Sequence, residues 1–233
     1  MSKLGLIWVC LGVLLTWGGS TALAGGNAVG TVHPDSTKWP SLFKKDFSNA
    51  LCDRNVWFYN KEGLLTANRD QVIWTDKEYE NFVLDIEYRL DPAANSGVLI
   101  YNRNMKNWIP HTVEIQLLDD LHPRWRKDPL NMKNGSLYGH LGPKVSKAKP
   151  AREWNRMTIT AKGKRVTVAL NGEIYVEADL STMTSAKTNP DGSRIPRWLS
   201  RPWADLPTCG RIGLQGKHGG ATIYFRSVKI KQL

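Results

Sequence analysis

The sequence contains few cysteines and no second long apolar run. Of its three cysteines, Cys10 falls within the apolar stretch near the N-terminus, so the rest of the chain can form at most the Cys52–Cys209 disulfide. Such a bridge would stabilise the fold by at most about 5 kcal/mol, and two free thiols are an equal alternative because spacing does not show whether the residues meet. No later apolar segment reaches spanning length, so we expect no membrane span in the mature chain.

Motifs of several chemistries are also missing. The sequence has no phosphate-binding loop and no nucleophile elbow. Its five histidines lack the spacing of common metal sites and lie at positions 33, 111, 122, 140 and 218. Asp119, Asp120 and His122 form a small cluster that could hold a cation, although turn residues after a strand are the simpler interpretation. We therefore expect no resident cofactor, with a divalent cation at this cluster as the remaining option.

Basic residues outnumber acidic ones, and the formal net charge is +11. The cations are scattered, and zinc-finger spacing, a basic helix and an aromatic RNA-binding signature are all absent. We therefore expect no nucleic-acid partner. The densest basic loops cover residues 144–152 and 194–201. Solvated loops are the simplest interpretation of both, and attraction to acidic glycans or envelope polymers is the alternative.

The N-terminal residues have the pattern of a secretory signal peptide. Lys3 precedes an apolar run over residues 4–17, and Ala22-Leu23-Ala24 fits the small-x-small rule for cleavage. The run is shorter than the roughly 20 residues that a membrane helix needs. We expect an exported protein, periplasmic or extracellular, that matures after Ala24.

Strand patterns dominate the rest of the chain. Residues 82–90 and 154–160 alternate with period two. Asn171-Gly172 separates two further alternating runs and predicts a hairpin, because both residues tolerate a positive φ. Residues 211–215 and 221–230 are expected to form a final pair. Without helical periodicity, these runs predict an all-β sandwich in one domain over residues 42–233, preceded by an extension over residues 25–41.

The most informative pattern lies between Asn95 and Asp120. Two strands are expected there, and the second places Glu114 and Gln116 on one face while Ile115 and Leu117 point the opposite way. An acid beside an amide on a strand backed by apolar residues predicts the floor of a binding site. A solvated sheet face is the alternative.

Two long loops carry aromatic side chains that suit sugar rings. Residues 119–150 contain Trp125 and Tyr138, and residues 181–207 contain Trp198 and Trp203. Long ordered loops in a compact domain are usually functional. Each indole either stacks on a ligand or pins its loop to the core.

An ordered set of segments resembles the 3-keto-disaccharide hydrolase domain family, also described as 3-keto-glucoside-1,2-lyase/3-keto-2-hydroxyglucal hydratase domains. The resemblance covers residues 43–233, and the nearest subgroup carries the insertion Trp108-Ile-Pro110. Many members have Arg directly after the Asn-Ser-Gly strand, where this chain has Tyr101 followed by Arg103. The segments are Trp74-Thr-Asp-Lys-Glu-Tyr-Glu-Asn-Phe82, Asn95-Ser-Gly-Val98, Val113-Glu-Ile-Gln-Leu-Leu-Asp-Asp120, Gly135-Ser-Leu-Tyr-Gly139, Glu153-Trp-Asn155, Leu170-Asn-Gly172, Gly210-Arg-Ile-Gly-Leu-Gln-Gly-Lys-His218 and Phe225-Arg-Ser-Val-Lys-Ile230.

The resemblance implies a concanavalin-like jelly-roll of two antiparallel sheets and a carbohydrate substrate, a 3-keto-glycoside. A ketone at sugar C3 acidifies the C2 proton, so cleavage needs a base, donors for the enediolate and an acid for the leaving group. Glu114 is the candidate base, and Gln116 would position a hydroxyl. The candidate donors are Arg103, Lys217 and His218, and the candidate acids are Tyr138 and His140. The further substrate-binding candidates are Asn95, Tyr101, Trp125, Trp198, Trp203 and Gln215.

Two other functions fit the same fold. A non-catalytic carbohydrate-binding domain would use the same face and the loop tryptophans. A glucanase-like glycosidase would need two carboxylates flanking the bond. The position two residues after Glu114 holds Gln116, which argues against that pair and favours elimination with a single base.

Overall fold

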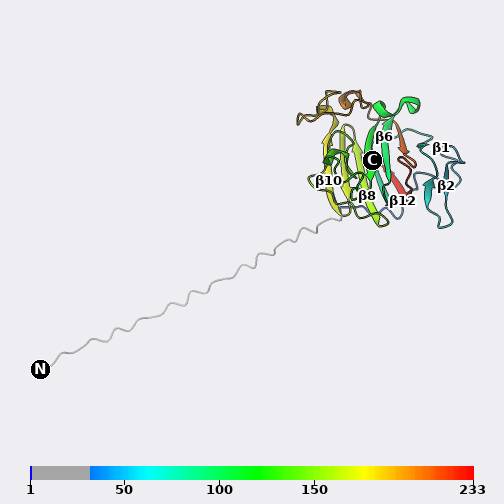
Figure 1. The fold of residues 1–233 in the computed structure, drawn as a ribbon, viewed down its shortest axis with the longest axis horizontal. Helices are drawn as coiled ribbons and strands as arrows, with labels where there is room; N and C mark the ends of the chain where they lie inside the picture. The colour runs from blue at the N-terminus through cyan, green and yellow to red at the C-terminus, as the bar shows by residue number, and fades with distance from the viewer. Residues whose placement is uncertain (2–31) are drawn as a thin grey trace. The chain divides into compact units, whose positions relative to one another are not determined.

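The computed structural model describes residue 1 and residues 32–233. Within that part, two antiparallel sheets and short 3₁₀ turns form a jelly-roll sandwich, which confirms the predicted all-β class (Figure 1). The expected signal peptide lies outside the described residues, apart from Met1. Among the residues described, no helix is long and apolar enough to cross a membrane.

The larger sheet has seven strands, and several neighbouring strands in it are far apart in the sequence. Its two longest neighbours, β5 and β12, pair from Phe82↔Gln232 to Leu90↔Ile223. In spatial order the strands are β10 (Glu173–Asp179), β9 (Arg165–Leu170), β8 (Trp154–Lys162), β5 (Phe82–Leu90), β12 (Ile223–Gln232), β3 (Leu65–Ala67) and β2 (Trp57–Tyr59).

The smaller sheet has five strands and carries the candidate site. At one edge of this sheet β7 pairs with β6, with Gly97 opposite Gln116 and Leu99 opposite Glu114. In spatial order the strands are β1 (Ala50–Leu51), β4 (Ile73–Thr75), β11 (Arg211–Leu214), β6 (Asn95–Asn102) and β7 (Val113–Leu118). The short 3₁₀ turns are η1 (Met105–Asn107), η2 (Ile109–His111), η3 (Leu130–Met132), η4 (Leu180–Thr182) and η5 (Trp203–Asp205).

One strand prediction is confirmed and another is wrong. Asn171 and Gly172 both have positive φ and join β9 to β10 as an antiparallel hairpin, as the sequence predicts. β11 and β12, however, do not pair with each other. β11 lies between β4 and β6, whereas β12 lies between β5 and β3 in the other sheet. The loop between them therefore crosses from one sheet to the other, which alternation within each strand does not reveal.

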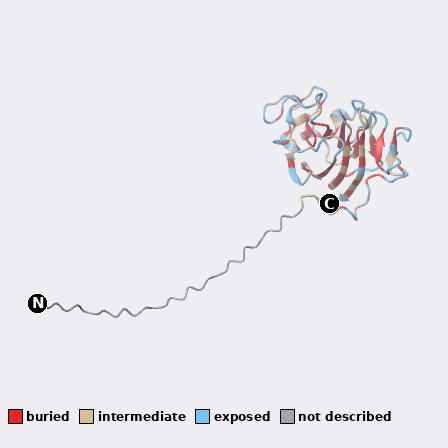
Figure 2. Ribbon diagram, turned by 60° about the horizontal axis from the view of Figure 1, so that its bottom comes forward, coloured by how far each residue is buried: buried red, intermediate tan, exposed pale blue. Residues whose placement is uncertain are grey.

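The core lies between the two sheets, and buried residues follow the strands while the loops are mostly exposed (Figure 2). Ile115 and Leu117 of β7 belong to this core. Since side chains alternate along a strand, Glu114 and Gln116 project from the opposite face, away from the core. The predicted division of β7 into an apolar and a polar face is confirmed.

The segment before the sandwich packs against the larger sheet. Asp85 of β5 is only 2% exposed, and its carboxylate accepts hydrogen bonds from Ser36 Oγ at 2.5 Å and Thr158 Oγ1 at 2.7 Å. It also forms a two-point ion pair with Arg156, at 3.1 and 2.9 Å. Arg156 in turn donates to the carbonyl of Pro34 at 2.6 Å. This polar network fixes residues 34–36 to the sheet.

Candidate active site

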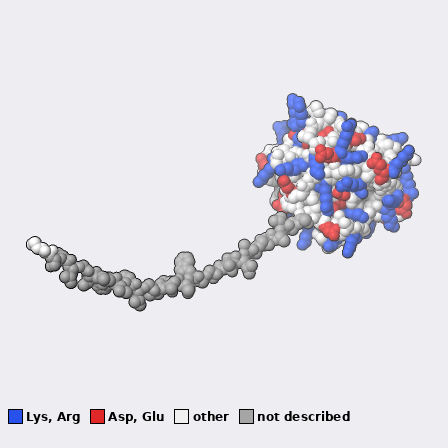
Figure 3. All heavy atoms as spheres, turned by 90° about the horizontal axis from the view of Figure 1, so that it is seen from below, with Lys and Arg blue, Asp and Glu red and all other residues white. Residues whose placement is uncertain are grey.

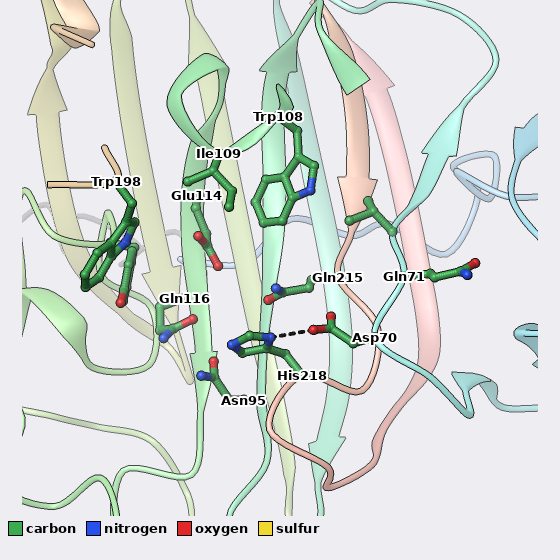
Figure 4. Close-up of a pocket in the computed structure, with 12 residues that line it drawn as sticks. Asp70, Gln71, Asn95, Trp108, Ile109, Glu114, Gln116, Trp198, Gln215 and His218 are labelled. Atoms are coloured by element: carbon green, nitrogen blue, oxygen red, sulfur yellow. Dashed lines mark hydrogen bonds and ion pairs between the residues drawn. The ribbon is translucent and has the colours of Figure 1, made fainter. Parts of the chain in front are cut away.

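A cavity of about 380 Å³ lies on the outer face of the five-stranded sheet (Figure 4). Its floor is formed by β6, β7 and the end of β11, and loops provide its walls. Pockets with a few convergent polar groups among apolar side chains are typical of ligand sites. The lining residues are Asp70, Gln71, Val72, Asn95, Trp108, Ile109, Glu114, Gln116, Tyr138, Trp198, Gln215 and His218.

The position of Glu114 depends on the absence of a side chain on the neighbouring strand. A Cβ atom at Gly97 would collide with Glu114 Oε1 and would stand 3.0 Å from Glu114 Cδ. The carboxyl group therefore lies over Gly97. Figure 4 shows the Glu114 side chain among the residues that line the cavity. Gly97 thus contributes space for the carboxyl group, whereas Asn95 of the same segment lines the cavity.

The environment of Glu114 favours its neutral form. Burial, and to a smaller extent the negative charge of Asp70, together raise the pKa of this carboxyl to about 8. Among the described residues, neither a cation nor a hydrogen-bond donor offsets the burial. A carboxyl with a pKa near neutrality can exchange protons in both directions under physiological conditions, which suits acid–base catalysis.

His218 and Asp70 form a hydrogen-bonded pair at the cavity (Figure 4). Nδ1 of His218 lies 2.7 Å from Asp70 Oδ2, and both side chains are about half exposed, at 48% and 49%. Because a carboxylate accepts, Nδ1 carries the proton and Nε2 is left for a ligand. Gly216 permits this pairing, since a Cβ there would collide with the carbonyl oxygen atoms of Arg69 and Gln71.

Four carboxamides, those of Gln71, Asn95, Gln116 and Gln215, complete the polar part of the cavity. Gln116 is only 3% exposed, and its Oε1 has no hydrogen-bond partner among the described residues. Its backbone is fixed to residues 135 and 136, with N–H to O distances of 2.7 and 3.0 Å. Gln215 is also buried, and its backbone N–H donates to the carbonyl of Gly97 at 2.9 Å. Buried amides with free hydrogen-bonding capacity suit the hydroxyl groups of a sugar.

Apolar side chains form the opposite part. Trp108 lies between the turns η1 and η2, Ile109 is the first residue of η2, and Trp198 comes from the loop of residues 181–207 (Figure 4). Trp198 is 56% exposed, so its indole is available to a ligand rather than packed in the core. Tyr138 also lines the cavity, and burial together with the charge of Glu114 raises its pKa to about 12. The phenol therefore stays protonated and can donate a hydrogen bond.

The cavity brings together part of the set that the sequence predicts. Of the candidates, it contains Asn95, Glu114, Gln116, Tyr138, Trp198, Gln215 and His218. It also contains residues that sequence analysis did not select as site residues. Trp108 and Ile109 belong to the insertion that marks the nearest subgroup, so a signal for them existed. Asp70 and Gln71 precede β4 in an ordinary turn, and their place is evident only from their contact with residues 216–218.

His140 and Trp203 do not line the cavity. Their rings stack with a centroid distance of 3.6 Å, and both residues are almost fully buried. Burial lowers the pKa of His140 to about 4, so the imidazole is neutral at ordinary pH. His140 Nδ1 lies 3.1 Å from the carbonyl of Tyr138 and helps to hold that segment. The two rings are therefore packed inside the protein, outside the lining of the cavity.

Four other candidates also lie outside the lining. Tyr101 is fully buried, and its hydroxyl donates to the carbonyl of Gly163 at 2.9 Å. Arg103 is on the surface in an ion pair with Glu78 at 3.1 Å. Trp125 donates its indole N–H to Ala93 at 3.2 Å and lies under Arg124. Lys217 contributes its backbone N–H to the turn beside Asp70, at 2.9 Å from the carbonyl of Arg69.

The suggested cation cluster is occupied by internal hydrogen bonds. Asp119 Oδ2 accepts from the Ala93 N–H at 2.9 Å, and Asp120 accepts from the Asn134 N–H at 2.8 Å and from Ser146 Oγ at 2.5 Å. His122 Nδ1 accepts from the Arg124 N–H at 3.2 Å. Within the described part of the chain, no three His, Cys, Asp or Glu side chains gather as a metal site. Cys52 and Cys209 are free thiols.

Solved structures show the same architecture. A candidate glycosyl hydrolase from Parabacteroides distasonis ATCC 8503 is similar with a TM-score of 0.81 and 47% identity, covering 84% of this chain and 100% of that one. A second candidate glycosyl hydrolase from that organism has a TM-score of 0.66 and 23% identity, covering 81% of this chain and 90% of that one. The second likeness shows the fold alone. Comparison with curated proteins gives no match.

The fold, the cavity and the first of these relatives define a carbohydrate-active protein. A family model described as the 3-keto-alpha-glucoside-1,2-lyase-like domain matches residues 35–231. The chain therefore belongs to this family, as its ordered motifs predict.

Proposed function

We propose that the protein is an enzyme that cleaves 3-keto-glycosides by removing the C2 proton and eliminating the C1 substituent. The family and the relative described as a candidate glycosyl hydrolase support an enzyme acting on carbohydrate. The observation that carries the reaction is the carboxyl group of Glu114, which lies in a sugar-sized cavity with a pKa raised to about 8.

Glu114 acts as the base in this proposal. The C3 ketone makes the C2 proton acidic, the carboxylate takes it, and the electrons form an enediolate with the charge on the C3 oxygen. The buried amides of Gln116 and Gln215 offer hydrogen bonds where that charge develops. A carboxylate with a pKa of about 8 is a stronger base than an ordinary one, at the cost of being ionised in only about a tenth of molecules near pH 7.

His218 is the acid in this proposal. The enediolate collapses to a C1=C2 double bond conjugated with the C3 ketone, and the C1–O bond breaks as the leaving oxygen receives a proton. Asp70 stabilises the protonated imidazole from behind at 2.7 Å. Tyr138 is a poor proton source because its pKa is about 12, so it serves as a hydrogen-bond donor. Addition of water at C1, with return of the proton to C2, completes net hydrolysis.

The indole side chains favour a second candidate function, a non-catalytic carbohydrate-binding domain. Trp198 is largely exposed at the cavity, and stacking on a sugar needs no chemistry. A binding domain has no reason to hold a carboxyl group with a raised pKa, whereas a general base does. A direct glycosidase would need Asp70 as a second free carboxylate, but that group is engaged by His218.

Incubation with a 3-keto-glucoside and with its unoxidised parent tests the proposal. The expected result is release of the leaving group from the keto compound only. A conventional glycosidase would release it from the parent, and a binding domain from neither. Glu177, which is exposed on β10, offers a matched Glu→Gln control for Glu114→Gln.

We also propose that the enzyme is exported, from the signal-peptide pattern of residues 1–24. Mass spectrometry of the mature protein is expected to give an N-terminus at Gly25. An intact Met1 would contradict export through this signal.

A further inference from the structure

A second hollow, of about 570 Å³, lies in the loop that supplies Trp198. Three of its lining residues are cations, and two more carry hydroxyl groups. None of its lining residues is acidic. The residues are Ala186, Lys187, Thr188, Arg194, Ile195, Arg197 and Ser200.

The hollow is built on an ordered hairpin. Thr188 and Arg194 face each other in an antiparallel bridge, and the Ile195 N–H donates to the carbonyl of Lys187 at 2.9 Å. Asn189, only 6% exposed, donates to the carbonyl of Gly139 at 3.0 Å. Gly139 follows Tyr138, which lines the sugar cavity. The hairpin is therefore fixed directly to the wall of that cavity.

The cations of this hollow have no acidic partners. Within residues 32–233, Lys187, Arg194 and Arg197 form no ion pair. Asp191 at the hairpin tip is engaged by Ser193, at 2.9 Å from its N–H and 2.7 Å from its hydroxyl group. Basic and acidic side chains are interspersed on the face shown in Figure 3. Three cations around one hollow without a carboxylate in its lining thus form a local positive field.

This hollow borders the sugar cavity. Arg197 and Ser200 line the hollow, whereas Trp198, between them in sequence, lines the cavity. Consecutive Cα atoms are about 3.8 Å apart, so a single stretch of backbone forms a wall of both spaces. Trp198 is more than half exposed, so a ligand can extend over its edge.

We propose that the hollow binds an anionic group, carboxylate or sulfate, on the leaving group of the glycoside whose sugar occupies the cavity. The guanidinium groups of Arg194 and Arg197 can each hold such a group through two N–H donors. This inference rests on the proposed function for the sugar and adds the class of its leaving group. Solvated loop cations are the alternative, and they predict no preference between charged and neutral leaving groups.

Matched substrates test the inference. The wild type is assayed with phenyl, 4-carboxyphenyl and 4-sulfophenyl 3-keto-glucosides, and the test variant is Arg194→Gln/Arg197→Gln. Wild type is expected to show a lower KM for the charged compounds, and the variant to lose about tenfold of that preference as a ratio of kcat/KM values. A larger loss for one compound identifies carboxylate or sulfate as the better fit. Raising the salt concentration should weaken the preference in the wild type only.

A control removes the same charge elsewhere. Lys38→Gln/Lys44→Gln changes two exposed lysines that line a different hollow. An equal loss in this control, or equal KM values for charged and neutral compounds in the wild type, would overturn the inference. Binding of the unoxidised glucosides, followed by calorimetry in the wild type and the test variant, needs no turnover. This measurement shows whether the hollow binds the anionic group even if no 3-keto-glycoside is cleaved. Absence of cleavage would reject the proposed function but not the anion site.

Discussion

The carboxyl group of Glu114 occupies the space that a side chain at Gly97 would need. Gly97 lies opposite Gln116 in the β6–β7 pairing, so the carboxyl of Glu114 reaches diagonally across to the neighbouring strand. This orientation places the carboxyl group in the cavity, where no described cation pairs with it, and its surroundings raise its pKa to about 8. The absence of a Cβ atom at Gly97 therefore permits this position of the proposed base, and the surroundings at that position raise its pKa.

Gly97→Ala is expected to reduce kcat/KM by about 10- to 100-fold, because the new Cβ forces the Glu114 side chain to turn away. The fold should survive, since the colliding atoms belong to the end of a flexible side chain. Steady-state kinetics and thermal unfolding measure the two effects. In a Glu114→Gln background, Gly97→Ala should not lower kcat/KM any further, because the base is already absent. Additive losses would show that Gly97 acts by another route.

Glu114→Gln is expected to change how stability depends on pH. The folded carboxyl has a pKa of about 8 and the unfolded one a value near 4.5. Between these values the unfolded state loses its proton first, so the wild type becomes less stable as pH rises, by a few kcal/mol in all. Glutamine does not titrate. Denaturant unfolding at pH 5 and pH 8 measures the free energy of unfolding of both proteins. Relative to the wild type, the variant should be more stable at pH 8 than at pH 5. The same difference in stability at both pH values would contradict the raised pKa.

The pH profile of kcat/KM should follow the ionisation of the same carboxyl. Leaving groups of low pKa need little help from His218 as the acid, so a substrate of this kind isolates the ionisation of the base. With such a substrate the rate is expected to rise about tenfold per pH unit and to level off near pH 8. A limb with a midpoint near pH 4.5 would indicate an ordinary, solvated carboxylate as the base.

Asp70→Asn is expected to lower kcat by about 10- to 100-fold. The amide cannot stabilise the imidazolium of His218, and Asp70 lies 2.7 Å from its ring nitrogen. In the proposed reaction His218 protonates the leaving oxygen, so leaving groups of low pKa should be less affected than those of high pKa. A series of substituted phenyl 3-keto-glucosides measures this dependence. An equal loss for all members would assign Asp70 a role in structure or binding only.

Asp85→Ala is expected to destabilise the protein by about 3 kcal/mol, because it leaves Arg156, Ser36 and Thr158 without their buried partner. Glu87→Ala is the control on the same strand. Its partner Arg226 is 44% exposed, so that loss should stay below about 1 kcal/mol. Similar unfolding free energies for the two variants would contradict the role of the N-terminal segment in the fold.

Local pattern predicted much of this molecule. Period-two alternation located β5 and β8, and Asn171-Gly172 located the β9–β10 hairpin. It also placed Glu114 and Gln116 on one face, because side-chain direction on a strand depends only on parity. The resemblance added the jelly-roll architecture.

The rest of the site depends on contacts between distant segments. Asp70 and His218 are 148 residues apart and meet only because the loop before β4 contacts the loop after β11. His140 and Trp203 are residue types that often contact sugars, yet here their rings stack on each other and hold two loops together. Whether an aromatic ring faces a ligand or the core is decided by what packs behind it, and local sequence does not contain that information.

Deuterium at C2 of a 3-keto-glucoside tests the central claim most directly. If Glu114 removes the C2 proton, the deuterated compound should react several-fold more slowly than the protiated one in wild type, and Glu114→Gln should bind it with little change in Kd while losing at least 100-fold in kcat. Equal rates for the two isotopologues, together with full activity of Glu114→Gln, would contradict proton abstraction by this carboxylate.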